Sequence, residues 1–190
     1  MIEEFQLVGR ELFLAGLNNS HSGNFSIRLG DKLIITRRGS MLGNLTAEDL
    51  IEVHLWEEDS SLIYASTEVE VHRSIYRNTP ALSIVHAHPP YAVALSFFYD
   101  TIEPIDAEGK YFLPRIPVIT TKETIGAMEV ARILPYWLSK YRIVVLREHG
   151  SFAIGDFLEE AFQLTTSLEH SCKILYFNKM FSPFKEVNRK

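Results

Sequence analysis

The stretch Ser83-Ile84-Val85-His86-Ala87-His88-Pro89-Pro90 decides how this chain is arranged. Its apolar half predicts a buried strand, which the two prolines end because proline has no N–H to donate to a sheet ladder. Alternate residues of a strand project to the same face, so we expect His86 and His88 to lie side by side. Neighbouring imidazoles at a strand end suit a divalent metal. Two buried, hydrogen-bonded histidines or two surface histidines would show the same spacing.

The composition of the 190-residue chain is that of a globular protein. With 46% apolar and 12% aromatic residues it can bury a sizeable core, and we expect a single domain over residues 1–190. A formal net charge of −5, with no basic run longer than Arg37-Arg38, argues against nucleic acid or an anionic membrane as the partner. A phosphorylated substrate remains compatible, since a local pocket can be positive in an acidic protein.

The sequence gives no sign of export or membrane insertion. Cys172 is the only cysteine, so no intrachain disulfide can form and a reducing compartment fits. The acidic N-terminus lacks the order of a signal peptide, and no apolar run reaches the roughly eighteen residues of a membrane span. We therefore expect a cytoplasmic protein with no membrane partner.

Hydrophobic periodicity divides the chain into interleaved helices and strands, without a repeat or a linker. We expect helices over residues 2–17, 66–80, 91–99, 126–141 and from 156 onward. Strands are expected over residues 25–29, 32–36, 52–56, 81–88, 115–119, 142–148 and 151–154. Residues 104–114 are expected to be a loop, Pro135 to break or kink its helix, and Thr67 with Glu70 to form a capping box. Interleaving of this kind predicts a mixed α/β fold.

A second histidine-bearing strand and one acidic residue extend the metal hypothesis. Residues 143–146 predict a buried strand that His149 follows, and Glu68 opens a helix. Three imidazoles and a carboxylate make a four-ligand set that zinc prefers, and a carboxylate that left the metal would be a base beside it. A purely structural zinc site with four fixed ligands remains open. His72 is expected on the helix surface or supporting the site from behind.

Glycines and hydroxyls next to expected strand ends suit a phosphate group. Gly23-Asn24 follows a loop, Arg38-Gly39-Ser40 leaves a strand, and Ser66-Thr67 stands at a helix N-terminus. Close backbone approach at glycine, hydroxyl donors and the positive end of a helix all favour an anion. Taken singly, each piece is more often an ordinary turn or cap.

Together these motifs resemble the class II aldolase/adducin family, and within it most closely the small L-fuculose-1-phosphate aldolases. The motifs are Gly23–Arg28, Ile35-Thr36 with Gly39, Ser66-Thr67-Glu68, Ile84–His88 and His149-Gly150, in the family's order, between about Phe5 and Phe177. The resemblance implies a three-layer αβα fold whose central sheet is mixed, mainly antiparallel, with helices on both faces. It also implies a homotetramer with sites at subunit boundaries.

The same resemblance implies roles for single residues. Zinc would be bound by His86, His88 and His149, and Glu68 would complete the site or transfer a proton. The phosphate of the substrate would be bound by Gly23, Asn24, Arg38, Gly39, Ser66 and Thr67. Arg38 and His21 stand where the aldolases tend to have threonine, and Arg38 would replace a neutral donor by a charge-assisted one. Tyr111 is the candidate for the tyrosine that a neighbouring subunit supplies in the family, and we expect no C-terminal tail like that of the longer aldolases.

By resemblance, the chain is a zinc-dependent aldolase that cleaves a ketose 1-phosphate, such as fuculose 1-phosphate, into dihydroxyacetone phosphate and an aldehyde. Zinc as a Lewis acid and a carboxylate as proton acceptor suit that reaction. An epimerase of a pentulose 5-phosphate and a methylthioribulose-1-phosphate dehydratase share the scaffold and remain alternatives. The alternative outside enzymes is an adducin-like interaction module, against which the joint presence of His86, His88, His149 and Glu68 argues.

Overall fold

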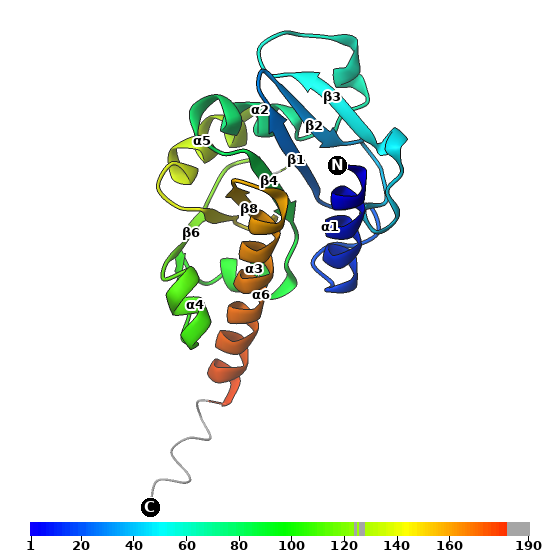
Figure 1. The fold of residues 1–190 in the computed structure, drawn as a ribbon. Helices are drawn as coiled ribbons and strands as arrows, with labels where there is room; N and C mark the ends of the chain where they lie inside the picture. The colour runs from blue at the N-terminus through cyan, green and yellow to red at the C-terminus, as the bar shows by residue number, and fades with distance from the viewer. Residues whose placement is uncertain (124, 126–127, 182–190) are drawn as a thin grey trace, which may run out of the picture.

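The computed structural model describes residues 1–123, 125 and 128–181, and its centre is one eight-stranded sheet (Figure 1). The strands are β1 (Asn24–Leu29), β2 (Lys32–Thr36), β3 (Leu50–His54), β4 (Ser83–Ala87), β5 (Thr101–Ile102), β6 (Ile116–Ile119), β7 (Ile143–Leu146) and β8 (Gly150–Gly155). They are ordered β3-β2-β1-β4-β8-β7-β6-β5, and of these pairs only β6 with β7 is parallel. The predicted mixed, mainly antiparallel sheet is confirmed.

Helices cover both faces of the sheet and complete three layers. The α-helices are α1 (Ile2–Leu14), α2 (Val69–Asn78), α3 (Pro90–Ser96), α4 (Ala107–Phe112), α5 (Met128–Leu138) and α6 (Leu158–Phe181). The short 3-10 turns are η1 (Leu42–Asn44), η2 (Ala47–Asp49) and η3 (Ser60–Ile63). One core cluster joins α1, α3 and α6 to the sheet, and the other joins α2 and α5 to its opposite face. Throughout the described part of the chain, every helix is too short or too polar to span a lipid bilayer.

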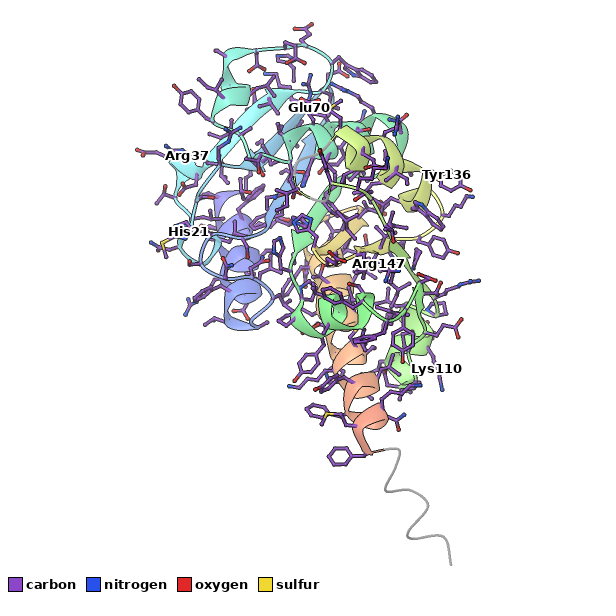
Figure 2. All side chains as sticks on the ribbon, turned by 180° about the vertical axis from the view of Figure 1, so that it is seen from behind. His21, Arg37, Glu70, Lys110, Tyr136 and Arg147 are labelled. Carbon is purple, nitrogen blue, oxygen red and sulfur yellow. The ribbon has the colours of Figure 1, made fainter. Side chains whose placement is uncertain are left out.

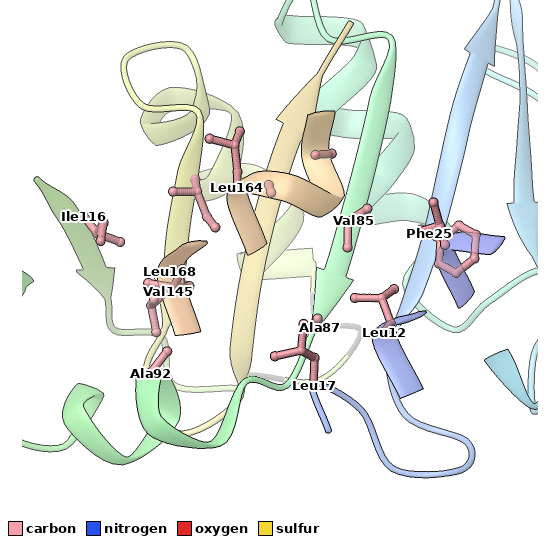
Figure 3. Packing of buried hydrophobic residues seen from close by; sticks show 14 of the residues in the cluster. Leu12, Leu17, Phe25, Val85, Ala87, Ala92, Ile116, Val145, Leu164 and Leu168 are labelled. Atoms are coloured by element: carbon pink, nitrogen blue, oxygen red, sulfur yellow. The ribbon is translucent and has the colours of Figure 1, made fainter. Parts of the chain in front are cut away.

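Strand β4 runs through the middle of the sheet and is buried along its whole length. Val85 and Ala87 face the α1, α3 and α6 layer, where Figure 3 shows them near Leu12 and Leu17. Ile84 faces the α2 and α5 layer instead. Because helices cover both faces, the strand is buried at every position rather than alternately. His86, two residues beyond Ile84, therefore projects toward α2 and α5.

Residues 107–112 form helix α4, so the prediction of a loop over residues 104–114 was wrong. The Asp106 carboxylate accepts a hydrogen bond from the backbone N–H of Gly109 at 2.7 Å and caps the helix. The short edge strand β5 was also missed. Cys172 is buried on α6, as its place on the apolar stripe predicted.

Pro135 lies inside helix α5 without ending it, although the sequence predicts a break or a kink there. Proline lacks the N–H that would bond the carbonyl of Ala131 four residues earlier. The hydroxyl of Ser74, on α2, donates to that carbonyl oxygen at 2.6 Å. A donor from a neighbouring helix thus satisfies the freed acceptor. The expected start of this helix at residues 126–127 lies outside the described residues.

Gly150, the first residue of β8, lies directly against the backbone of Ala87 at the end of β4. A Cβ atom there would be 2.2 Å from the carbonyl oxygen of Ala87 and 3.1 Å from Cδ2 of His88. Gly150→Ala is therefore expected to lower the free energy of unfolding by about 3 kcal/mol, the upper end of overpacking costs. Denaturant titration checks this against Ser151→Ala, which removes only a buried hydroxyl that bonds nothing among the described residues. Equal midpoints for the two variants would contradict the close approach.

Candidate metal centre

Three histidine rings meet at one end of strands β4 and β8. His86 is on β4, His88 follows that strand directly, and His149 lies in the turn between β7 and β8. Each pair of ring centroids is 4.8 Å apart, and one ligand nitrogen from each ring lies within 4.8 Å of the others. The antiparallel pairing of β4 with β8 brings these distant parts of the sequence together. The three histidines are thus positioned for a metal ion.

The turn that carries His149 is held by contacts on both sides. Glu148 has a φ of 66°, in the left-handed region that residues other than glycine rarely adopt. Its backbone N–H donates to the hydroxyl of Ser96 at 3.0 Å. Beside it, the guanidinium of Arg147 pairs with Asp100. These contacts fix the backbone that presents the His149 ring.

Hydrogen bonding determines which nitrogen of His86 faces the cluster. Its Nδ1 lies 2.9 Å from the carbonyl oxygen of Ser151, which can only accept, so Nδ1 carries the proton. The neutral ring then presents the lone pair of Nε2, which is 3.0 Å from Nε2 of His88 and 3.1 Å from Oε2 of Glu68. Burial, and next the nearby His149, hold the pKa of His86 well below its usual range. Burial and then His86 lower the pKa of His88 to about 3, so both rings are neutral near pH 7.

Glu68 is the buried carboxylate of the site and is only 3% exposed. Its Oε2 accepts a hydrogen bond from Nδ2 of Asn24 at 2.9 Å, while its Oε1 is buried without a hydrogen-bond partner in the described part of the chain. Helix α2 begins one residue later, and the hydroxyl of Ser66 accepts from the backbone N–H of Glu68 at 3.3 Å. The predicted capping box of Thr67 with Glu70 was therefore wrong.

The donor set of this cluster fits a divalent cation. The neutral Nε2 of His86 offers only a lone pair, and the Glu68 carboxylate 3.1 Å away offers only acceptor oxygens. Such groups repel one another unless a proton or a metal ion lies between them. Imidazole nitrogens with one carboxylate oxygen are ligands that zinc and similar divalent ions accept.

A cavity of about 220 Å³ adjoins the cluster and contains both predicted constellations. Its lining includes the three histidines and Glu68 together with the residues assigned to the phosphate: Gly23, Asn24, Arg38, Gly39, Ser66 and Thr67. Gly23 and Gly39 have φ values of 76° and 72°, which explains glycine at both positions. Tyr111 does not line this cavity; it is 80% exposed on α4, and its role stays a prediction.

Two further basic residues, Arg37 and His21, also line the cavity, although no role was predicted for either from the sequence. They lie on the same side of the molecule in Figure 2. The signal for Arg37 is the Arg37-Arg38 pair, which in the sequence indicates only a surface charge. With Arg38 they add basic side chains to the lining of the cavity.

Comparison with known proteins places the chain in a family. The crystal structure of l-fuculose-1-phosphate aldolase from Thermus thermophilus is similar, with a TM-score of 0.91 and 39% identity over 95% of both chains. Among curated proteins, "3-oxo-tetronate 4-phosphate decarboxylase" of Pectobacterium atrosepticum is 33% identical over 91% of this chain and 82% of its own. "L-fuculose phosphate aldolase" of Methanocaldococcus jannaschii is 28% identical over 93% of this chain and 96% of its own. Residues 3–176 match the family described as Class II Aldolase and Adducin N-terminal domain, so the chain belongs to the class II aldolase and adducin family.

Proposed function

We propose that this protein is a zinc-dependent aldolase that cleaves a ketose 1-phosphate, fuculose 1-phosphate or a close analogue, into dihydroxyacetone phosphate and an aldehyde. One observation supports this most strongly. A single cavity is lined both by the three histidines with Glu68 and by basic, glycine and hydroxyl groups. The sugar end of one substrate would chelate a metal at the histidines, and its phosphate end would bind the basic, glycine and hydroxyl groups.

Residues of the cluster would hold the metal and move the proton. His86, His88, His149 and Glu68 would bind the ion, which as a Lewis acid would stabilise negative charge on the substrate oxygens. Oε2 of Glu68 is held by Asn24, whereas Oε1 has no partner among the described residues. The carboxylate would therefore exchange the proton of the reacting carbon through Oε1, with Oε2 fixing its orientation.

Arg38, which lines the cavity, would bind the phosphate of the substrate, and its replacement tests that role. Arg38→Ala is expected to raise KM for the phosphorylated ketose about 10- to 100-fold, since a hydrogen bond to a charged group is worth roughly 1.5–3 kcal/mol. Turnover is expected to change little, because the phosphate is held equally before and during reaction. Steady-state kinetics measure both constants.

The matched control is Lys32→Ala, which removes a cation that pairs with Glu52 and does not line the cavity. It is expected to leave KM unchanged. An unchanged KM in Arg38→Ala as well, or an equal rise for an unphosphorylated ketose, would contradict phosphate binding by Arg38.

A decarboxylase acting on a 3-oxo sugar acid phosphate is the second candidate. The 33% identical relative from Pectobacterium atrosepticum carries the name of such an enzyme. The additional basic groups, Arg37 and His21, would suit a substrate with a carboxylate besides its phosphate. Both reactions need a group that stabilises negative charge on an oxygen next to the broken carbon–carbon bond.

The deciding experiment combines metal analysis with a substrate panel. The purified protein is analysed for metal and offered fuculose 1-phosphate and other ketose 1-phosphates, 3-oxo-tetronate 4-phosphate, a pentulose 5-phosphate and methylthioribulose 1-phosphate. We expect stoichiometric zinc and release of dihydroxyacetone phosphate, lost on chelation and restored by zinc. Dihydroxyacetone phosphate formed together with carbon dioxide from 3-oxo-tetronate 4-phosphate, with no aldehyde released from any ketose 1-phosphate, would establish the decarboxylase instead. Epimerisation or dehydration would support those alternatives.

We also propose a homotetramer, on the family resemblance, in which Tyr111 of one subunit would serve the site of its neighbour. The exposure of Tyr111 on α4 is compatible with such a contact. A solution mass of one chain would argue against this assembly.

A further inference from the structure

A buried row of polar side chains joins helix α2 to strand β1 directly behind the candidate metal centre. Glu68, His72 and Tyr76 stand four residues apart and share one face of the helix. Asn24 and Ser26 stand two apart and share one face of the strand. The two spacings match, so that Asn24 bonds Glu68 at 2.9 Å and Ser26 Oγ lies 2.7 Å from Nδ1 of His72.

The second of these two contacts is closed off from solvent. His72 and Ser26 have no exposed surface. The Ser26 hydroxyl also lies 2.8 Å from the hydroxyl of Tyr76, which donates to the Ser26 carbonyl oxygen at 2.9 Å. Burial lowers the pKa of His72 to about 4, so the neutral ring acts through its hydrogen bond. A polar row of this kind is favourable only when its members are bonded to one another, which fixes how helix and strand fit.

The row also contacts the metal cluster from behind. Phe152 of β8 stacks on the His86 ring, with centroids 4.2 Å apart and an interplanar angle of 18°. The His72 ring meets the same phenyl group edge-on at 6.3 Å. The position of α2 on β1 is therefore coupled, through Phe152, to the position of the His86 ring.

Glu68 has little else to hold it in place. Its side chain makes no bond to the start of its own helix, and among the described residues its hydrogen bond is to Asn24, with Nε2 of His86 3.1 Å away but without a proton to donate. Where its carboxylate lies relative to His86 thus depends on how α2 rests on β1. Functional groups must be held to within about 0.5 Å, and a shift of the helix by more would separate Glu68 from the histidines.

We propose that His72, through its hydrogen bond to Ser26, is a positioning residue that holds the Glu68 carboxylate beside His86 of the histidine cluster. The inference rests on the proposed metal centre and extends it to a residue that does not line the cavity. Partners that orient ligands in this way typically account for 10- to 100-fold in metal affinity.

The test measures zinc affinity by competition with a chromophoric chelator, which requires no substrate. His72→Phe, which keeps a ring, and Ser26→Ala are each expected to weaken zinc binding about 10- to 100-fold. His72→Asn, whose amide can replace Nδ1, is expected to restore most of the affinity. Ser83→Ala is the matched control, since it removes a hydroxyl of another buried serine, which donates to the carbonyl oxygen of Phe157 at 2.8 Å, and it should bind zinc like the wild type.

The decisive comparison repeats His72→Phe in a Glu68→Gln background. If His72 acts through Glu68, adding His72→Phe to the Glu68→Gln protein changes its zinc affinity less than about twofold. Substitutions at two residues that act through one another are not additive. An equal loss in both backgrounds, or wild-type affinity in His72→Phe and Ser26→Ala, would overturn the proposal. Should His72→Phe fail to unfold cooperatively, Ser26→Ala in the same two backgrounds gives the answer.

The outcome is separable from that of the proposed function. Weaker zinc binding in these variants with no cleavage of any ketose phosphate would reject the aldolase and retain the positioning role. Cleavage of a ketose phosphate by the wild-type protein, together with unchanged zinc affinity in His72→Phe and Ser26→Ala, would retain the aldolase and reject the positioning role. A wild-type protein that takes up no zinc would overturn both.

Discussion

Glu68→Gln is expected to leave the protein folded and to lower turnover about a hundredfold or more. Glutamine keeps the shape of the side chain, and its amide oxygen can still accept the hydrogen bond from Asn24. It cannot take up a proton, and general acid–base catalysis contributes roughly 10²- to 10⁴-fold. Turnover with saturating zinc and ketose phosphate is the measurement.

The zinc content of the same variant separates the two roles of the carboxylate. Retained zinc with lost turnover would identify Glu68 as the base, and loss of both would identify a ligand. Glu52→Gln, an exposed carboxylate on β3 that pairs with Lys32, serves as control and should react like the wild type. Near-normal turnover in Glu68→Gln would remove Glu68 from the mechanism.

His149→Ala is expected to abolish stoichiometric zinc binding and the activity with it. The ring projects from a turn, so its loss disturbs packing less than loss of the fully buried His86 would. Removing a ligand should exceed the roughly 10- to 100-fold that removing a ligand's hydrogen-bond partner costs. Elemental analysis and chelator competition measure the loss.

His170→Ala is the control for that experiment, because His170 is exposed on α6 and does not line the metal cavity. Its zinc content should equal that of the wild type. A His149→Ala protein that still binds one zinc with wild-type affinity would take His149 out of the ligand set.

Much of the fold could be predicted because its signals are local. The apolar runs around His86 and before His149 indicate buried strands, and both strands lie in the middle of the sheet. The continuity of helix α5 could not be predicted in this way. It depends on Ser74, whose hydroxyl reaches the carbonyl freed by Pro135 from a different helix. A contact between residues 57 positions apart leaves no local pattern.

In the candidate site, too, features with a local sequence signal could be predicted, and features that depend on contacts between distant residues could not. Each histidine of the cluster ends or follows a strand, so its place was visible from the sequence, and the resemblance joined the three. The helix start was not visible, since the hydroxyl of Ser66 rather than Thr67 receives the first N–H. The sequence left His72 either on the helix surface or supporting the site from behind, and it could not decide between them, because burial depends on how a helix and a strand are matched face to face.

The pairing of β4 with β8 also sets the order of events when the protein is made. The carbonyl that fixes the His86 ring belongs to Ser151, 65 residues further along the chain. A ribosome must therefore release most of the polypeptide before the three imidazoles can meet, and the nascent chain has no preformed metal site. A metal ion held by all three histidines would accordingly be bound only after most of the chain has been made and β8 has paired with β4.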